Sequence, residues 1–129
     1  MTSPGYRKTM QSKINEQSVQ CVKAALDILS RELTHPISYS EAAFRIGLPA
    51  CEANRYCSSI ITRALNLMCK EDMSKNCPLR ATLFVSKRRG IPSKGFWKSQ
   101  DVGLDWVAER DKFEAHEALL AEFLMWRKS

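Results

Sequence analysis

The sequence predicts a mainly α-helical protein with one small β-hairpin (α+β) and an excess of positive charge. Apolar residues recur at helical spacing over several stretches, a single β-rich stretch lies in the second half, and Pro and Gly separate these stretches. The chain has 129 residues, of which 44% are hydrophobic and 26% charged, a composition typical of a globular domain. We expect one core at this length, which excludes a multi-domain enzyme.

The first predicted helix follows a basic lead. Residues 1–13 are expected to form a flexible N-terminus, and residues 14–129 a single domain. Pro36 is expected to end the helix, because the residue before a proline leaves the α region. The apolar stripe of this helix consists of Val19, Val22, Leu26, Leu29 and Leu33. It favours a core helix, with a dimer seam as the alternative.

A short helix and a long one are expected next. Ser38 and Glu41 have the spacing of a capping box, and Gly47 suits a left-handed turn at the end of the short helix. Pro49 suits the first turn of the long helix, where its missing N–H removes no hydrogen bond. The long helix is expected over residues 49–70. Its polar side consists of Glu52, Asn54, Arg55, Ser58, Ser59, Thr62, Arg63 and Asn66.

The β-rich stretch follows a turn-like segment, residues 71–79. Ala81, Leu83 and Val85 alternate with other residues, as in a strand with one buried side. We expect Gly90 to turn the chain, and the residues after it to return as a short strand or extended arm. The predicted hairpin spans residues 80–98. Its basic tip consists of Lys87, Arg88 and Arg89, with Lys94 close by.

A C-terminal helical extension is expected after the hairpin. Asp101 is expected to cap a short helix that holds Trp106, and Asp111 with Glu114 to begin a last helix. On that helix His116 is expected at the polar edge. Trp97 is a candidate contact for a nucleic acid or a protein partner.

Positive charge is concentrated in one part of the chain. The formal net charge is +6. Residues 73–100 contain seven basic side chains and no acidic one, whereas residues 101–129 are net acidic. The seven are Lys75, Arg80, Lys87, Arg88, Arg89, Lys94 and Lys98. Such segregation is typical of a surface that binds a polyanion.

Other classes of function have little support in the sequence. The five cysteines form no CxxC pair, so we expect reduced, packed thiols, no disulfide framework and no metal site. No apolar run is long enough to span a membrane, and no secretory signal is recognisable. We therefore expect a cytoplasmic protein without a membrane partner. The absence of a glycine-rich phosphate loop or a paired-carboxylate motif predicts that it is not an enzyme and has no cofactor.

The order of the elements is that of a winged helix-turn-helix with an N-terminal helix and C-terminal helices. In such a domain a helix enters the major groove, while a basic hairpin contacts flanking phosphates. The predicted function is non-catalytic binding of double-stranded DNA, through the long helix 49–70 and the basic hairpin 80–98. The expected contacts are Asn54, Arg55, Ser58, Ser59, Thr62, Arg63, Lys87, Arg88, Arg89 and Lys94.

Part of the chain resembles a known family. Ser38-Tyr39, Ala43, Gly47 and Pro49 have the spacing of the Ser-Tyr…Ala…Gly-x-Pro signature in the DNA-binding domain of O6-alkylguanine-DNA alkyltransferases and alkyltransferase-like proteins. The resemblance covers roughly residues 36–110. It implies that Tyr39 rotates a phosphate and that an arginine replaces an extruded base, although Arg55 stands two positions late for that role. The family's Pro-Cys-His-Arg motif is missing, so the resemblance implies a DNA-binding scaffold without methyl transfer.

A protein target is the alternative to DNA. Small basic proteins with a single winged helix are frequent in phages and other mobile elements, where they act as repressors or inhibitors. The same basic face would then bind a host protein, such as a nucleic-acid-processing or defence complex. The sequence leaves both targets open, and it does not give the oligomeric state.

Overall fold

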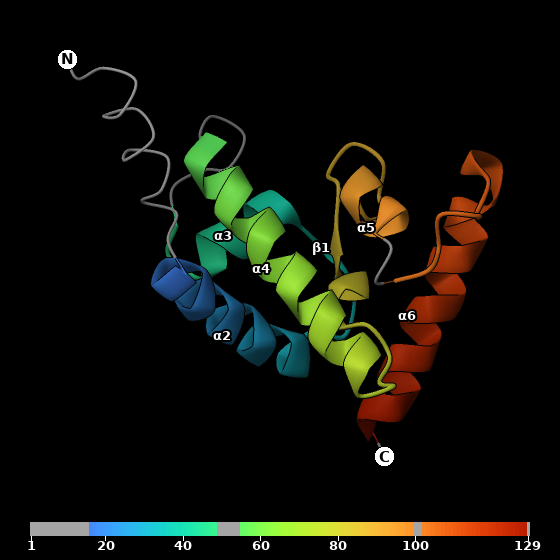
Figure 1. Cartoon of the computed structure of the whole chain (residues 1–129), viewed down its shortest axis with the longest axis horizontal. Coiled ribbons are helices and arrows are strands. Elements are labelled where there is room, and N and C mark those ends of the chain that lie inside the picture. Colours follow the sequence, from blue (N-terminus) through green and yellow to red (C-terminus); the bar gives the residue numbers. More distant parts are fainter. Residues whose placement is uncertain (1–15, 49–54, 100–101, 129) are drawn as a thin grey trace.

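The structure is a computed structural model that describes residues 16–48, 55–99 and 102–128. Helices dominate these residues, with one small two-stranded sheet (Figure 1). The elements in chain order are α2 (Glu16–Glu32), β1 (Ile37–Ser38), α3 (Tyr39–Arg45), α4 (Arg55–Ser74), the 3₁₀ helix η2 (Arg80–Leu83), β2 (Phe84–Val85), α5 (Lys94–Lys98), the 3₁₀ helix η3 (Glu109–Asp111) and α6 (Lys112–Lys128). The mainly helical prediction is confirmed.

The long helices α2 and α4 pack against each other, with α4 across the front of the molecule in Figure 1. The predicted stripe of α2 is buried or partly buried along its whole length. It joins the buried side of α4, which includes Ile60, Ala64 and Met68. The stripe therefore belongs to the core of this chain, as the core-helix prediction has it. Removal of these apolar side chains from water stabilises the packing of α2 on α4.

Both ends of α3 match the sequence prediction. The Oγ atom of Ser38 accepts a hydrogen bond from the Glu41 N–H over 3.0 Å. In a full capping box the Glu41 carboxylate would also accept from the Ser38 N–H. Here that carboxylate pairs with Arg45 instead, so only half of the capping box is formed. Gly47 has φ +88, and the Leu48 N–H bonds back to the Ala43 carbonyl over 2.8 Å. This is the Schellman arrangement, which favours glycine because its φ is positive.

The carboxyl end of α4 lies further along the chain than predicted. The helix continues to Ser74, whereas the sequence placed its end at Lys70 and a turn over residues 71–79. Asn76 has φ +56, and the Cys77 N–H bonds to the Asp72 carbonyl over 2.8 Å. Asn76 thus takes the left-handed position that glycine usually occupies. The predicted start of this helix, residues 49–54, lies outside the described residues.

The predicted antiparallel hairpin over residues 80–98 is wrong. β2 instead pairs in parallel with β1, with Ile37 opposite Phe84 and Ser38 opposite Val85. Residues 81–85 are all buried, so this stretch has no solvent-facing side. Its first residues belong to the 3₁₀ helix η2 rather than to a strand. A tight loop follows, closed by the bond from the Ser86 N–H to the Ile91 carbonyl. Residues 94–98 then form α5 rather than a return strand.

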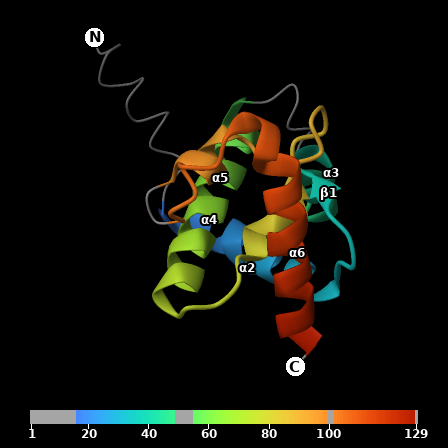
Figure 2. The same cartoon turned by 90° about the vertical axis from the view of Figure 1, so that its right-hand side faces the viewer.

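The C-terminal part also corrects several expectations. Residues 102–108 form turns instead of the predicted short helix, and Asp101 lies outside the described residues. The last helix is present as α6, which packs on η2 (Figure 2). His116 is buried rather than at the polar edge, with its Nε2 atom 2.8 Å from the Thr82 carbonyl oxygen. Trp97 is 1% exposed and belongs to the core, so it is no surface contact.

Candidate nucleic-acid interface

The side of α4 that faces solvent is polar and basic. Its exposed residues recur every three or four positions, so they lie on one side of the helix. The acidic residues of α4, Glu71 and Asp72, turn toward Arg80 instead. The exposed residues of this side are Ser59, Thr62, Arg63, Asn66 and Lys70.

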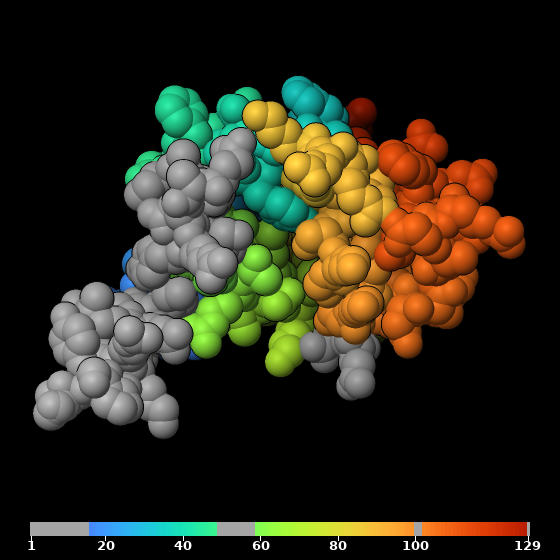
Figure 3. Space-filling view, turned by 90° about the horizontal axis from the view of Figure 1, so that it is seen from above, coloured from blue at the N-terminus to red at the C-terminus, as the bar shows by residue number. Residues whose placement is uncertain are grey.

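The beginning of α5 lies beside this side of α4. Thr62 and Asn66 line the same small cavity as Ser93 and Gly95 at the start of α5. The loop between β2 and α5 and the amino end of α4 are at the same end of the molecule in Figures 1 and 2. Figure 3 shows that end, with the loop beside α3 and α5. The exposed cations here are Lys87, Arg88, Lys94 and Lys98.

Tyr39 connects α3 to the beginning of α5. Its hydroxyl oxygen accepts a hydrogen bond from the Ser93 N–H over 2.8 Å. Burial raises the pKa of the Tyr39 phenol above its usual value, against the opposing effect of the hydrogen bonding with Ser93. The phenol is thus neutral near pH 7, and it positions the segment that carries Lys94.

Arg89 differs from its neighbour Arg88 because it has an acidic partner. It forms an ion pair with Glu109 of η3. The second oxygen of the same carboxylate accepts from Lys112 Nζ over 2.9 Å, and that ammonium lies 5.7 Å from the ring centroid of Trp97. The acidic C-terminal segment therefore neutralises one cation of the predicted tip.

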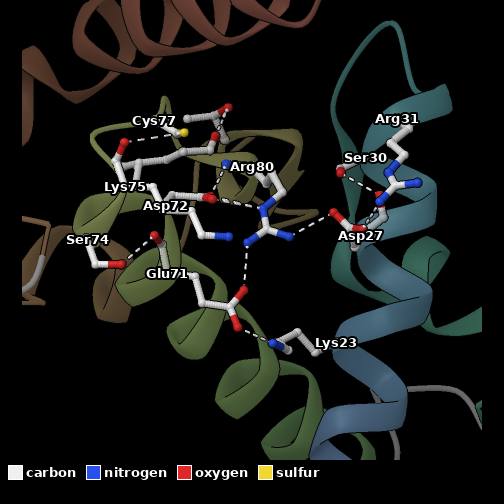
Figure 4. A network of polar contacts seen from close by, with 12 residues as sticks. Lys23, Asp27, Ser30, Arg31, Glu71, Asp72, Ser74, Lys75, Cys77 and Arg80 are labelled. Atoms are coloured by element: carbon white, nitrogen blue, oxygen red, sulfur yellow. Dashed lines mark hydrogen bonds and ion pairs between the residues drawn. The ribbon is translucent and has the colours of Figure 1, made fainter.

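Arg80, like Arg89, has acidic partners and does not belong to the exposed cations. Its guanidinium bonds to three carboxylates, at 3.0 Å from Asp72, 2.8 Å from Asp27 and 3.0 Å from Glu71 (Figure 4). Burial by itself lowers the pKa of this guanidinium, but the hydrogen bonds to the three carboxylates outweigh burial and raise it. Sequence reasoning missed the partners because Asp27 comes from α2, far away in the chain, and because Glu71 and Asp72 were expected in a turn rather than on α4.

The predicted contact residues that the structure describes lie on α4, on α5 beside it and in the loop before α5. Ser59, Thr62 and Arg63 lie on α4, while Lys87, Arg88 and Lys94 lie in the adjoining loop and α5. Asn54 lies outside the described residues, as do the side chains of Arg55 and Ser58. The prediction omitted Lys70 and Lys98, which stand seven residues after Arg63 and four after Lys94, on the same helix sides.

A larger cavity, of about 1070 Å³, lies elsewhere, between α2, the end of α4 and the end of α6. The Arg80 network forms part of its lining, beside Phe123 and Trp126. Across the described ranges, every buried side-chain nitrogen or oxygen has a hydrogen-bond partner, and no cluster of His, Cys, Asp and Glu has the arrangement of a metal site. The ion pairs of this cavity thus join α2, α4 and η2, while Arg127 of α6 donates to the Ser30 carbonyl of α2 over 2.6 Å.

The cysteine thiols give no sign of a site in the described part of the chain. Cys69 is buried, as predicted for a packed thiol, whereas Cys21 is exposed and Cys77 is half-buried. The Cys77 thiol lies 3.7 Å from the Lys75 carbonyl oxygen. The side chain of Cys57 lies outside the described residues.

Comparisons with known proteins return no matching family model, curated protein or solved structure. Of the helices in the described ranges, none has the length and apolar character that crossing a bilayer requires. The function is therefore inferred from the geometry of the exposed surface.

Proposed function

We propose that the protein binds double-stranded DNA without catalysis, through the exposed side of α4 and the cations of residues 87–98. The observation that carries this proposal is the absence of acidic side chains from two adjoining segments, residues 55–70 and 73–99. Apart from Lys75, which follows the carboxyl end of α4, their exposed cations are Arg63, Lys70, Lys87, Arg88, Lys94 and Lys98. We call this set the basic surface.

Duplex DNA suits this arrangement of charge. Its phosphates bind cations with release of counterions, which gives sequence-independent affinity that weakens as salt increases. The 20 residues of α4 form a rod about 30 Å long, and an α-helix fits the major groove of B-DNA. Ser59, Thr62 and Asn66 then face the base edges, while Lys87 and Arg88 of the loop and Lys94 of α5 contact phosphates on one side.

Four further residues receive roles in this proposal. Arg55 and Ser58 belong to the amino-terminal part of α4, and together with Asn54, which precedes them in the sequence, they are assigned further contacts with base edges. Tyr39 is assigned a positioning role, because its hydroxyl accepts from the Ser93 N–H beside Lys94. The loop over residues 86–91 takes the place of the predicted wing.

Charge reversal at two lysines of α5 tests the proposal. The test variant carries both Lys94→Glu and Lys98→Glu, and the control variant carries both Lys75→Glu and Lys128→Glu. All four lysines are exposed, and the two double variants change the net charge equally. We expect the first pair to weaken binding of a labelled random-sequence duplex at least about tenfold, with a shallower salt dependence, and the second pair to have a much smaller effect. Equal losses in the two pairs contradict the assignment of the surface.

An acidic protein surface is the second candidate target. Trp106 and Phe113 in the C-terminal segment are 77% and 58% exposed, and large exposed apolar side chains are typical of protein contacts. Two results together support this candidate over DNA. The chain binds no duplex even at low salt, and it captures one host protein in a way that nuclease treatment does not remove but that Lys94→Glu and Lys98→Glu abolish.

A further inference from the structure

Glu109 lies between a cation of the loop and a cation of α6. One oxygen of its carboxylate pairs with Arg89, and the other accepts from Lys112 Nζ over 2.9 Å. Arg89 comes from the segment without acids, whereas Glu109 comes from the acidic C-terminal segment. A single carboxylate thus connects the edge of the basic surface to the part of the chain that carries α6.

We propose that Glu109 competes with DNA phosphates for Arg89, so that duplex binding opens the Arg89–Glu109 ion pair. This proposal rests on the proposed function of the basic surface. A carboxylate and a phosphate both present anionic oxygens that accept paired N–H bonds from one guanidinium. Arg89 therefore exchanges one anion for the other, and Glu109 reduces the affinity for the duplex by occupying it beforehand.

The exposure of the pair favours such an exchange. The side chains of Arg89 and Glu109 are 36% and 61% exposed, and ion pairs in this setting are weak, altering an equilibrium about two- to five-fold. The Arg80–Asp72 pair is the contrasting case, with side chains that are 16% and 7% exposed. Opening that pair would leave a buried charge without a partner. The Arg80–Asp72 pair therefore stays formed, whereas Arg89 can leave Glu109 for a phosphate.

Release of Arg89 leaves Glu109 with a cation. Lys112 keeps its bond to the carboxylate, and its own side chain is 9% exposed and held over Trp97. Glu109 also lies just before α6, where the helix amino end favours a negative charge. The open state therefore contains no unpaired buried charge, and the competition involves only the exposed half of the cluster.

Glu109→Gln is the variant that tests the competition, and Asp105→Asn is its control. Asp105 is exposed and belongs to the same acidic segment, so both variants remove one negative charge. Affinity for a labelled random-sequence duplex is measured by fluorescence anisotropy over a series of salt concentrations. We expect Glu109→Gln to bind about two- to five-fold more tightly than Asp105→Asn, the factor set by the strength of an exposed ion pair.

The same comparison in an Arg89→Gln chain separates competition from a general charge effect. There the gain from Glu109→Gln should shrink to that from Asp105→Asn, because the contested guanidinium is gone. Arg89→Gln alone should make the slope of log K against log salt shallower by about 0.9, the value for one lost phosphate contact. This slope tests the exchange even if Glu109→Gln reduces the stability of the fold.

The results that overturn the proposal differ from those that overturn the proposed function. Equal affinity of Glu109→Gln and Asp105→Asn, or a gain that persists in the Arg89→Gln chain, overturns the competition. If the Lys94 and Lys98 reversals still weaken binding, DNA binding stands without it. A wild-type chain that binds no duplex even at low salt overturns both.

Discussion

The Nε atom of Arg80 lies 3.0 Å from Oδ1 of Asp72, while the Arg80 backbone N–H donates to the other oxygen of that carboxylate over 2.9 Å. Asp72 is near the end of α4 and 5% exposed, so one buried carboxylate determines where η2 begins relative to α4. Since β2 follows η2 directly, the same contact helps to position β2 beside β1.

Replacement of Arg80 by methionine should destabilise the protein strongly. Asp72 would remain buried without its guanidinium partner, and removal of one member of a buried pair typically costs about 3–5 kcal/mol. We expect a loss of about 3 kcal/mol in the free energy of unfolding, measured by urea denaturation. Arg31→Met is the control, because Arg31 also pairs with Asp27 but its side chain is 71% exposed; that loss should stay below about 1 kcal/mol. Similar losses in both variants would contradict a buried role for Arg80.

The Glu71 carboxylate should make stability depend on pH in the acid range. The hydrogen bond from Lys23 lowers the pKa of Glu71 below its ordinary value of 4.5; burial opposes this, and Arg80 adds to the lowering. Because the pKa is lower in the folded chain than in the unfolded one, the stabilisation is complete above pH 4.5 and is lost as the pH falls through the folded value. Melting temperatures between neutral pH and the acid range should therefore fall less steeply for Glu71→Gln and Lys23→Met than for the wild-type chain. Parallel curves for all three proteins would disprove the linkage.

The buried histidine of α6 should contribute to stability through one hydrogen bond. Nε2 of His116 lies 2.8 Å from the Thr82 carbonyl oxygen in the core. His116→Leu leaves that carbonyl buried without this donor, which costs about 1–3 kcal/mol. The matched variant is His35→Leu, since His35 is exposed, and a surface change of this kind stays within about 0.5 kcal/mol. Guanidinium denaturation of the two variants checks the difference, and equal midpoints would argue against a structural role for His116.

Local rules predicted α2, α3 and their ends, because each depends on residues that are close in the chain. The Ser38 cap, the Gly47 turn and the α2 stripe are of this kind. The β1–β2 pairing joins strands of two residues each that stand 47 positions apart, and so short a strand has no recognisable alternation. The burial of His116 and the contacts of Arg80 with Asp27 and of Arg89 with Glu109 likewise join distant segments. A count of charges could therefore not distinguish Arg80 and Arg89 from the exposed cations.

Tyr39→Phe should distinguish a positioning role from direct contact with a phosphate. The variant removes the oxygen that accepts from the Ser93 N–H, and the loss of one hydrogen bond of this type lowers the free energy of unfolding by about 0.5–1.5 kcal/mol. If the phenol only positions α5, duplex affinity falls modestly and the slope of log K against log salt is unchanged, because no cation has been lost from the surface. If the phenol instead contacts a phosphate, as the alkyltransferase resemblance implies, affinity falls while stability stays at the wild-type value. Urea denaturation and anisotropy titrations on the same preparations measure the two quantities together, so a loss of affinity without a loss of stability would refute the positioning role.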